Sequence, residues 1–200
     1  MHEALRIILP AYLAAFFLIA FVWRSYLVYK RTGINPYVVG KTKRPIDFLE
    51  AYYRVPTLAI LATTLIYSFL PGAYIYVSPI VWVDRVEIKT AGLVVMLCAL
   101  VWTATAQMQM GKSWRIGIDH EHETELIEQG LFAISRNPIF LGMRLALLGF
   151  FLALPSALML AAVVLADILM QIQVRLEEEF LTGVHGRQYT KFCARVRRWI

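Results

Sequence analysis

The sequence predicts an all-α, multi-pass membrane protein. Of its 200 residues, 59% are hydrophobic and only 17% are charged, and the mean hydropathy is +0.59. A soluble domain of this length rarely carries so large an apolar fraction. The apolar residues also gather into segments near the ~20 residues that a helix needs to cross the hydrocarbon core of a bilayer. We therefore expect about five transmembrane helices.

The five apolar segments differ in length and in how they end. Arg24, near the end of the first, is expected to snorkel to the membrane interface. In the second, Pro71-Gly72 marks a kink or an exit point. The last two are joined only at Pro155, which predicts a tight antiparallel hairpin that does not reach fully across the bilayer. The segments are residues 5–29, 57–77, 90–110, 139–154 and 156–173.

The basic residues indicate the orientation. Fifteen of the 20 lysines and arginines fall in residues 30–54, in the central loop and in the tail from Arg175, which this topology puts on one side. Only Arg6, Arg85 and Lys89 fall on the other. Because cytoplasmic connections are enriched in lysine and arginine, we expect an external N-terminus and a cytoplasmic C-terminus. We divide the chain into residues 1–110, with three spans and a basic loop, and residues 111–200, with a polar loop, the hairpin and the tail, as one integrated domain.

The longest polar connection, residues 111–142, is where we expect the functional site. It holds a Gly-containing turn at Gly130 and then the corner Ser135-Arg136-Asn137-Pro138. Proline is tolerated at a first helical position, so Pro138 marks the start of a new helix. The free N–H groups and the dipole at that start favour an anion. The hairpin brings the segment from Arg175 to this same cytoplasmic face.

Several other features of the sequence do not indicate a further functional site. The net charge of +6 is concentrated on the predicted cytoplasmic side, so no nucleic-acid partner is expected. Cys98 and Cys193 form no disulfide framework or metal-ligand spacing. Residues 119–123, Asp-His-Glu-His-Glu, contain metal-ligand residue types, but no second cluster matches them. We expect a solvated loop there and no metal.

Arg144 and Asp167 are charged residues inside the hairpin. They lie 11 residues before and 12 residues after Pro155, hence at similar depth. An intramembrane charge is costly and is usually paired or functional, so we expect an ion pair. It would either lock the hairpin or line a pocket for a lipid headgroup.

The C-terminal half carries an ordered set of motifs: G-x-S-W-R, L-I-E-x-G-L-F, S-R-N-P-I-F-L-G, R-x-E-E-x-x-L, G-x-x-Y and R-V-x-R. This combination, over residues 108–198, resembles the isoprenylcysteine carboxyl methyltransferase and phospholipid methyltransferase superfamily. The resemblance implies an integral membrane enzyme that uses S-adenosylmethionine (SAM) and acts on a lipid or prenylated acceptor among the membrane lipids.

The resemblance also implies a set of site residues. The family builds its SAM site from the loop, the corner and the acidic segment. Carried over, the corner becomes Arg136, Asn137, Pro138 and Phe140, and the acidic pair becomes Glu177 and Glu178. From their positions in the chain we add Gln107, Trp114, Leu126, Gly130 and Phe132 as cofactor-binding residues, and we expect Arg175, Glu178 and Arg144 to be the catalytic residues. The carboxylates suit the ammonium or ribose hydroxyls of SAM, Arg136 suits its carboxylate, and the aromatic rings suit adenine or the sulfonium.

Two positions depart from the carboxyl methyltransferase pattern R-H-P-x-Y. Asn137 stands in place of the histidine and cannot titrate near neutral pH, and Phe140 lacks the tyrosine hydroxyl. These changes weaken the prenylcysteine assignment and leave the acceptor open between a prenylcysteine carboxylate, an ethanolamine lipid amine and a hydrophobic small molecule. The oligomeric state also stays open. Competing hypotheses are an NADPH-dependent membrane sterol-type reductase, which resembles the same corner, and a non-catalytic membrane scaffold.

Overall fold

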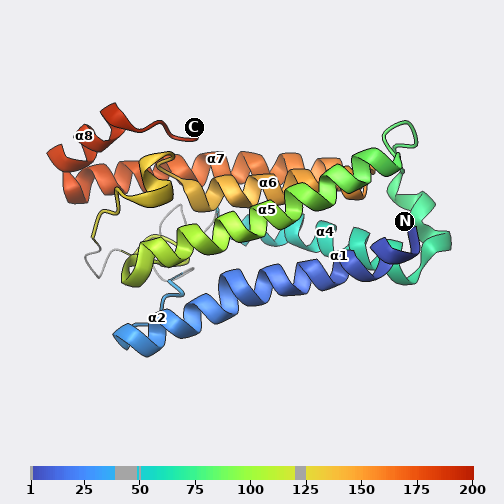
Figure 1. Cartoon of the computed structure of the whole chain (residues 1–200), viewed down its shortest axis with the longest axis horizontal. Helices are drawn as coiled ribbons and strands as arrows, with labels where there is room; N and C mark the ends of the chain where they lie inside the picture. Colours follow the sequence, from blue (N-terminus) through green and yellow to red (C-terminus); the bar gives the residue numbers. More distant parts are fainter. Residues whose placement is uncertain (1, 39–48, 50, 120–124) are drawn as a thin grey trace.

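The computed structural model describes residues 2–38, 49, 51–119 and 125–200, and the regular elements of this part of the chain are helices. The long helices lie side by side along one axis, and the N-terminus and α8 are at opposite ends (Figure 1). The elements are α1 (His2–Phe17), the π-helical segment η1 (Leu18–Trp23), α2 (Arg24–Thr32), α4 (Arg54–Phe69), η2 (Pro71–Val77), α5 (Val86–Met110), η3 (Gly111–Ser113), η4 (Gly130–Ala133), α6 (Pro138–Ala153), α7 (Ala157–His185) and α8 (Arg187–Arg195).

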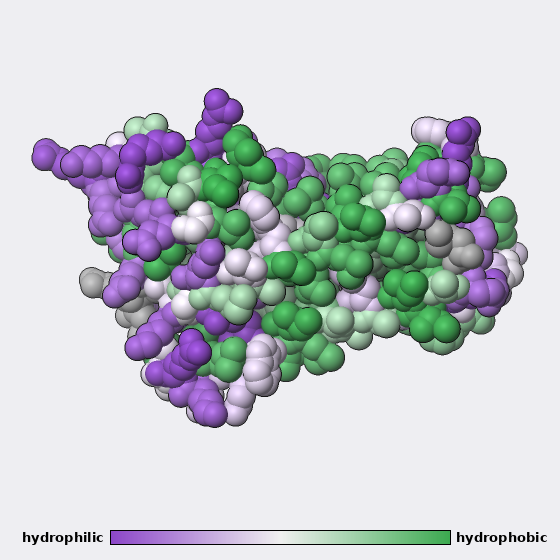
Figure 2. Space-filling model, viewed as in Figure 1, coloured by the Kyte–Doolittle hydropathy of each residue, from purple (hydrophilic) through white to green (hydrophobic). Residues whose placement is uncertain are grey.

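The surface of the structure confirms the prediction of a multi-pass membrane protein. A broad hydrophobic band lies between two hydrophilic ends (Figure 2). In the described part of the chain, three helices are long and apolar enough to cross a membrane: His2–Thr32, Val86–Ser113 and Ala157–His185. The shorter apolar helices α4 and α6 have 16 residues each, or about 24 Å, which is less than the ~30 Å hydrocarbon core. All five predicted apolar segments are therefore helical.

Prolines and a serine set the ends of the shorter helices. α4 ends at Phe69, so the second predicted segment is α-helical only in its first part, and Pro71 begins the separate 3-10 helix η2. The residue before a proline is pushed out of the α region, and Leu70 has φ −128° and ψ 59°. After Pro155, the Ser156 hydroxyl caps α7 by accepting from the Met159 N–H at 3.3 Å.

α7 is 29 residues long and therefore continues well past the apolar segment predicted at residues 156–173. Residues 157–174 form its apolar part, about 27 Å long, and the polar end from Arg175 extends beyond the apolar band. Glutamate, leucine and arginine are good helix formers, so the helix continues through Glu177, Glu178 and Glu179. These carboxylates therefore stand on a helix rather than on a tail that follows one.

The predicted pair inside the hairpin is confirmed. The Arg144 Nε donates to Asp167 Oδ1 at 2.5 Å and joins α6 to α7. The Arg144 guanidinium also lies 4.4 Å from the ring centroid of Trp199, near the C-terminus. One arginine thus ties the hairpin and the last residues of the chain together.

Small residues let α5 and α6 pack closely. A Cβ on Gly92 of α5 would lie 2.8 Å from both the Ala153 nitrogen and the Gly149 oxygen, which are backbone atoms. A Cβ on Gly142 would meet the Thr103 hydroxyl. The two helix backbones are therefore too close for any larger residue at these contacts.

Replacing Gly92 by alanine should destabilise the bundle by about 1–3 kcal/mol, because backbone atoms must move to accept the methyl group. Gly183→Ala is the matched control: it is also helical, and its Cβ would meet nothing within 4 Å. The control should be neutral or stabilising by up to about 1 kcal/mol. Thermal unfolding in detergent measures both, and equal melting temperatures would contradict the close contact.

Candidate functional site

A pocket lies at the polar end of the bundle, where segments distant in sequence meet. The end of α5, the loops around residues 115–119 and 125–132, the corner at Arg136, the polar end of α7, and α8 all contribute to it. The lining residues are Met110, Ser113, Arg115, Gly117, Ile118, Asp119, Glu125, Leu126, Ile127, Phe132, Arg136, Asn137, Glu177, Phe180, Leu181, Tyr189 and Phe192. The lining therefore combines carboxylates, arginines and aromatic rings.

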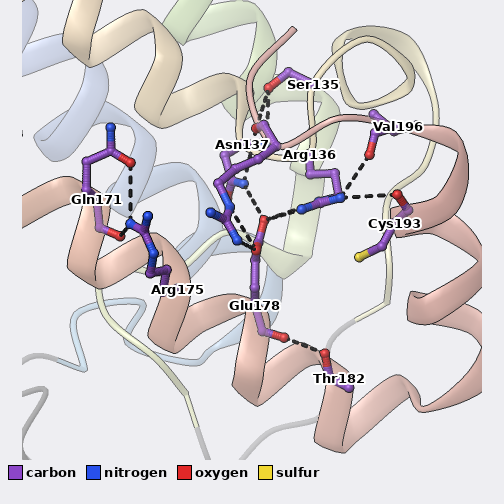
Figure 3. Close-up of polar contacts among 10 residues, drawn as sticks. Ser135, Arg136, Asn137, Gln171, Arg175, Glu178, Thr182, Cys193 and Val196 are labelled. Carbon is purple, nitrogen blue, oxygen red and sulfur yellow. Dashed lines mark hydrogen bonds and ion pairs between the residues drawn. The ribbon is translucent and has the colours of Figure 1, made fainter.

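Glu178 is the centre of a polar cluster beside this pocket. Its Oε1 accepts from Arg136 Nε at 3.1 Å and Nη2 at 2.9 Å, and from Asn137 Nδ2 at 3.2 Å. Figure 3 shows these side chains pointing toward one another from α7 and from the corner before α6. Side chains of the corner before α6 therefore hold the Glu178 carboxylate of α7.

The C-terminal segment completes the cluster. Arg198 donates to Glu178 Oε2 from Nε at 3.0 Å and from Nη2 at 2.7 Å. The Arg136 N–H donates to the Arg197 carbonyl at 3.0 Å, and its Nη1 donates to the carbonyls of Cys193 at 3.2 Å and Val196 at 2.9 Å. The corner, α7 and the C-terminal segment are therefore held as one unit around a single carboxylate.

The two adjacent glutamates have opposite electrostatics. Burial opposes ionisation of Glu178, but hydrogen bonds and charges from Arg198 and Arg136 outweigh it and lower its pKa. Burial, together with the Glu178 charge, raises the pKa of Glu177 to about 7. Burial also raises the pKa of Tyr189, so this pocket residue keeps its phenol proton. The ionised Glu178 carboxylate stabilises the folded protein. This stabilisation is fully present above the usual pKa of a glutamate and is lost as the pH falls through the lowered pKa of Glu178 in the folded state.

The structure brings five of the predicted cofactor residues to the pocket lining: Leu126, Phe132, Arg136, Asn137 and Glu177. Pro138, Phe140 and Gly130 lie close by without lining it. Pro138 is the first residue of α6 and its carbonyl accepts from Trp102 Nε1 at 2.8 Å. Phe140 is half-buried in the first turn of α6. Gly130, the first residue of η4, has φ +64°, the left-handed conformation that glycine adopts most easily.

Gln107 and Trp114 are buried toward α1 and α2 instead. The Gln107 amide donates to the Ala20 carbonyl in η1 at 2.9 Å. Trp114 is 3% exposed, and its ring centroid lies 5.9 Å from the guanidinium carbon of Arg24. These two residues join the first span to the end of α5.

The predicted catalytic residues Arg175 and Arg144 make other contacts. Arg175 is exposed and donates to the Gln171 carbonyl of its own helix at 2.8 Å (Figure 3). Arg144 is bound to Asp167. Neither lines the pocket.

Residues 120–124 of the predicted metal-free loop lie outside the described residues. In the part of the chain that is described, no group of three or more His, Cys, Asp or Glu side chains is placed to hold a metal ion.

The sequence-based site set lacks Arg198, Tyr189 and the apolar lining of Phe180 and Phe192. The motifs G-x-x-Y and R-V-x-R contain Tyr189 and Arg198, so a signal for both was present. The apolar lining residues carry no such signal, because a phenylalanine in a pocket and one in a core have the same sequence pattern.

The phospholipid methyltransferase family model matches residues 88–188. The chain belongs to this family. The match runs from α5 through the corner and the hairpin to the start of α8, and therefore includes Arg136, Glu177 and Glu178, whereas α1, α2 and α4 lie before it. Tyr189 follows directly after it, and Arg198 lies ten residues beyond its end. A search of the curated proteins found no match.

Glu178→Gln should destabilise the protein by about 1.5–3 kcal/mol, the range for hydrogen bonds to a charged group, because Arg136 and Arg198 lose their common counter-ion. Glu179→Gln is the control, since this neighbour is exposed and should change stability little. Thermal unfolding in detergent at neutral pH compares the two. Equal melting temperatures would show that Glu178 does not hold the cluster.

Proposed function

We propose that the protein is a SAM-dependent methyltransferase whose acceptor is a lipid or lipid-linked group in the bilayer. The family membership supports a membrane methyltransferase. The observation that carries the finer proposal is the pocket at the polar end of an apolar bundle, lined by Glu177, Arg136 and aromatic rings. A polar cofactor and an apolar acceptor would meet at such a boundary.

The pocket fits SAM by the chemistry of its lining. Glu177 has no ion pair within the described residues, so its carboxylate is available to an ammonium or a ribose hydroxyl. The rings of Phe132, Phe180 and Phe192 offer apolar faces to adenine and to a cationic sulfur. Arg136 is already paired with Glu178, so we expect Arg136 and the rest of the corner that it supports to bind a ligand carboxylate together.

SAM, when bound, supplies an electrophilic methyl group for in-line displacement. The chain's contribution is to align the reacting groups and exclude water. Loop residues 115–119 and 125–132 cover the pocket beside α8, and the Glu178 cluster fixes the corner beneath them. A carboxylate acceptor would need no base, whereas an ammonium acceptor must first lose a proton.

The proposed topology places the pocket on the cytoplasmic side and the N-terminus outside, as the distribution of lysine and arginine indicates. SAM would enter from the cytosol, and an apolar acceptor would enter sideways from the bilayer, because extracting it into water costs far more. α6 and α7 would form one wall of that lateral entrance.

The full-length protein in detergent, incubated with methyl-labelled SAM and a membrane lipid extract, should transfer label to a lipid fraction separated by chromatography. Calorimetric titration should show binding of SAM and none of NADPH. Binding of NADPH instead would support the reductase alternative, and binding of neither would favour a non-catalytic scaffold.

The affinity for SAM should rise with pH because the ionised Glu177 binds a cation. With a pKa of about 7, the dissociation constant should fall about fivefold from pH 6 to pH 7, while the α-amino group of SAM stays protonated. Glu177→Gln should bind weakly at both pH values, and Glu179→Gln should keep the wild-type pH dependence. Calorimetry measures all three proteins. A pH dependence that survives in Glu177→Gln would remove Glu177 from the cofactor site.

A further inference from the structure

Arg24 is a buried cation that has no counter-ion among the residues that the structure describes. Its side chain begins α2, and the residue is only 5% exposed, so the snorkelling expected from the sequence is wrong. Nη2 donates to the Gly111 carbonyl, and Nε is buried with no hydrogen-bond partner. Among the described residues, no carboxylate pairs with it.

The π-helical segment η1 explains why Arg24 faces inward. A π-turn accommodates an extra residue, which rotates the following side chains by about 100° relative to a regular α-helix. η1 covers Leu18–Trp23, directly before Arg24. The Ala20 carbonyl in this segment accepts from the buried Gln107 amide of α5, so α5 holds the irregular turn in place.

The contacts that Arg24 does make do not neutralise it. The Gly111 carbonyl belongs to the C-terminal end of α5, whose dipole supplies only about half an elementary charge. The Trp114 ring offers its face at 5.9 Å, which attracts a cation but carries no net charge. A buried cation with a free donor is costly, and an anionic ligand would relieve that cost.

The position of Arg24 indicates the source of the anion. Trp23, Tyr26 and Tyr29 on either side of it are 56%, 51% and 57% exposed, and such aromatic residues mark the membrane–water interface. Lipid phosphates lie at that depth. The bound carbonyl of Gly111 also lies directly after Met110, which lines the pocket. The Arg24 side chain thus stands between the lipid headgroup level and the candidate site.

We propose that Arg24 binds the phosphate of a phospholipid acceptor and holds its headgroup beside the pocket. This rests on the proposed function and deepens it by naming the headgroup chemistry. The guanidinium offers Nε and its remaining Nη donors to phosphate oxygens in the planar arrangement that arginine uses for phosphate. The phosphate-binding residue then comes from the first span, outside the segment that matches the family.

The test measures binding of short-chain phosphatidylethanolamine to the full-length protein in a phosphate-free maltoside detergent, followed by ³¹P NMR. The dissociation constant should rise at least tenfold in Arg24→Gln. Arg24→Lys, which keeps the charge but loses the planar donors, should lie between this variant and the wild type. Lys30→Gln removes an exposed charge from the same helix and should bind as the wild type does. Equal affinities of Arg24→Gln and wild type would overturn the proposal.

A second comparison uses the wild-type protein alone, so it holds even if Arg24→Gln fails to fold. Short-chain diacylglycerol, which lacks the phosphate, should bind at least tenfold more weakly than the phospholipid. Equal binding would overturn the proposal. Inorganic phosphate at millimolar concentration should compete only weakly, and full competition at the concentration of the lipid would make free phosphate the ligand and overturn the headgroup assignment.

SAM binding, measured by calorimetry on the same samples, distinguishes a failure of the Arg24 site from a failure of the proposed function. Arg24→Gln should leave the SAM dissociation constant within twofold of wild type, because the side chain does not line the pocket. Equal phospholipid binding by Arg24→Gln and the wild type, with SAM binding intact in both, would reject the Arg24 site alone. Absence of SAM binding in the wild type would reject the proposed function, whatever the lipid result.

Discussion

The Glu178 carboxylate is the interaction on which the polar end of the molecule depends. Two arginines that are 62 positions apart in the chain bind its two oxygens, Arg136 at Oε1 and Arg198 at Oε2. Without this counter-ion, two guanidinium groups would face each other at the boundary of the apolar band. The corner, the polar end of α7 and the last residues of the chain would then have little reason to stay together. The pocket walls are thus positioned electrostatically.

The apolar band is held by a different force. Lipid tails are as apolar as the helix surfaces, so close van der Waals packing and hydrogen bonds must hold the helices together. The α5–α6 contact shows this, because Gly92 and Gly149 allow backbone atoms to touch. α6 then leads back to the corner at its first residue, Pro138. Tight packing in the band therefore fixes where Arg136 and Asn137 stand at the polar end.

The sequence predicts the fold better than the site. The helical class, the five apolar segments, the start of α6 at Pro138 and the Arg144–Asp167 pair follow from hydropathy, proline chemistry and depth. Hydropathy does not predict how far α7 extends, because loss of hydropathy ends a membrane span but does not end a helix. Five predicted cofactor residues line the pocket, whereas Arg24 and Arg198 depend on contacts with residues that are distant in sequence. A π-turn has no sequence signal strong enough to reveal which way Arg24 faces.

The adjacent glutamates show how one helix can give two carboxylates different chemistry. Consecutive residues on a helix point about 100° apart, so Glu178 faces two arginines and Glu177 faces the pocket. The arginines keep Glu178 ionised at neutral pH, and its charge then adds to the burial that raises the pKa of Glu177 to about 7. A cation entering the pocket would find its partner in Glu177, because the charge of Glu178 is already shared by Arg136 and Arg198. The Glu178 cluster that holds the site together therefore also helps to raise the pKa of Glu177, the carboxyl group that remains available to a ligand.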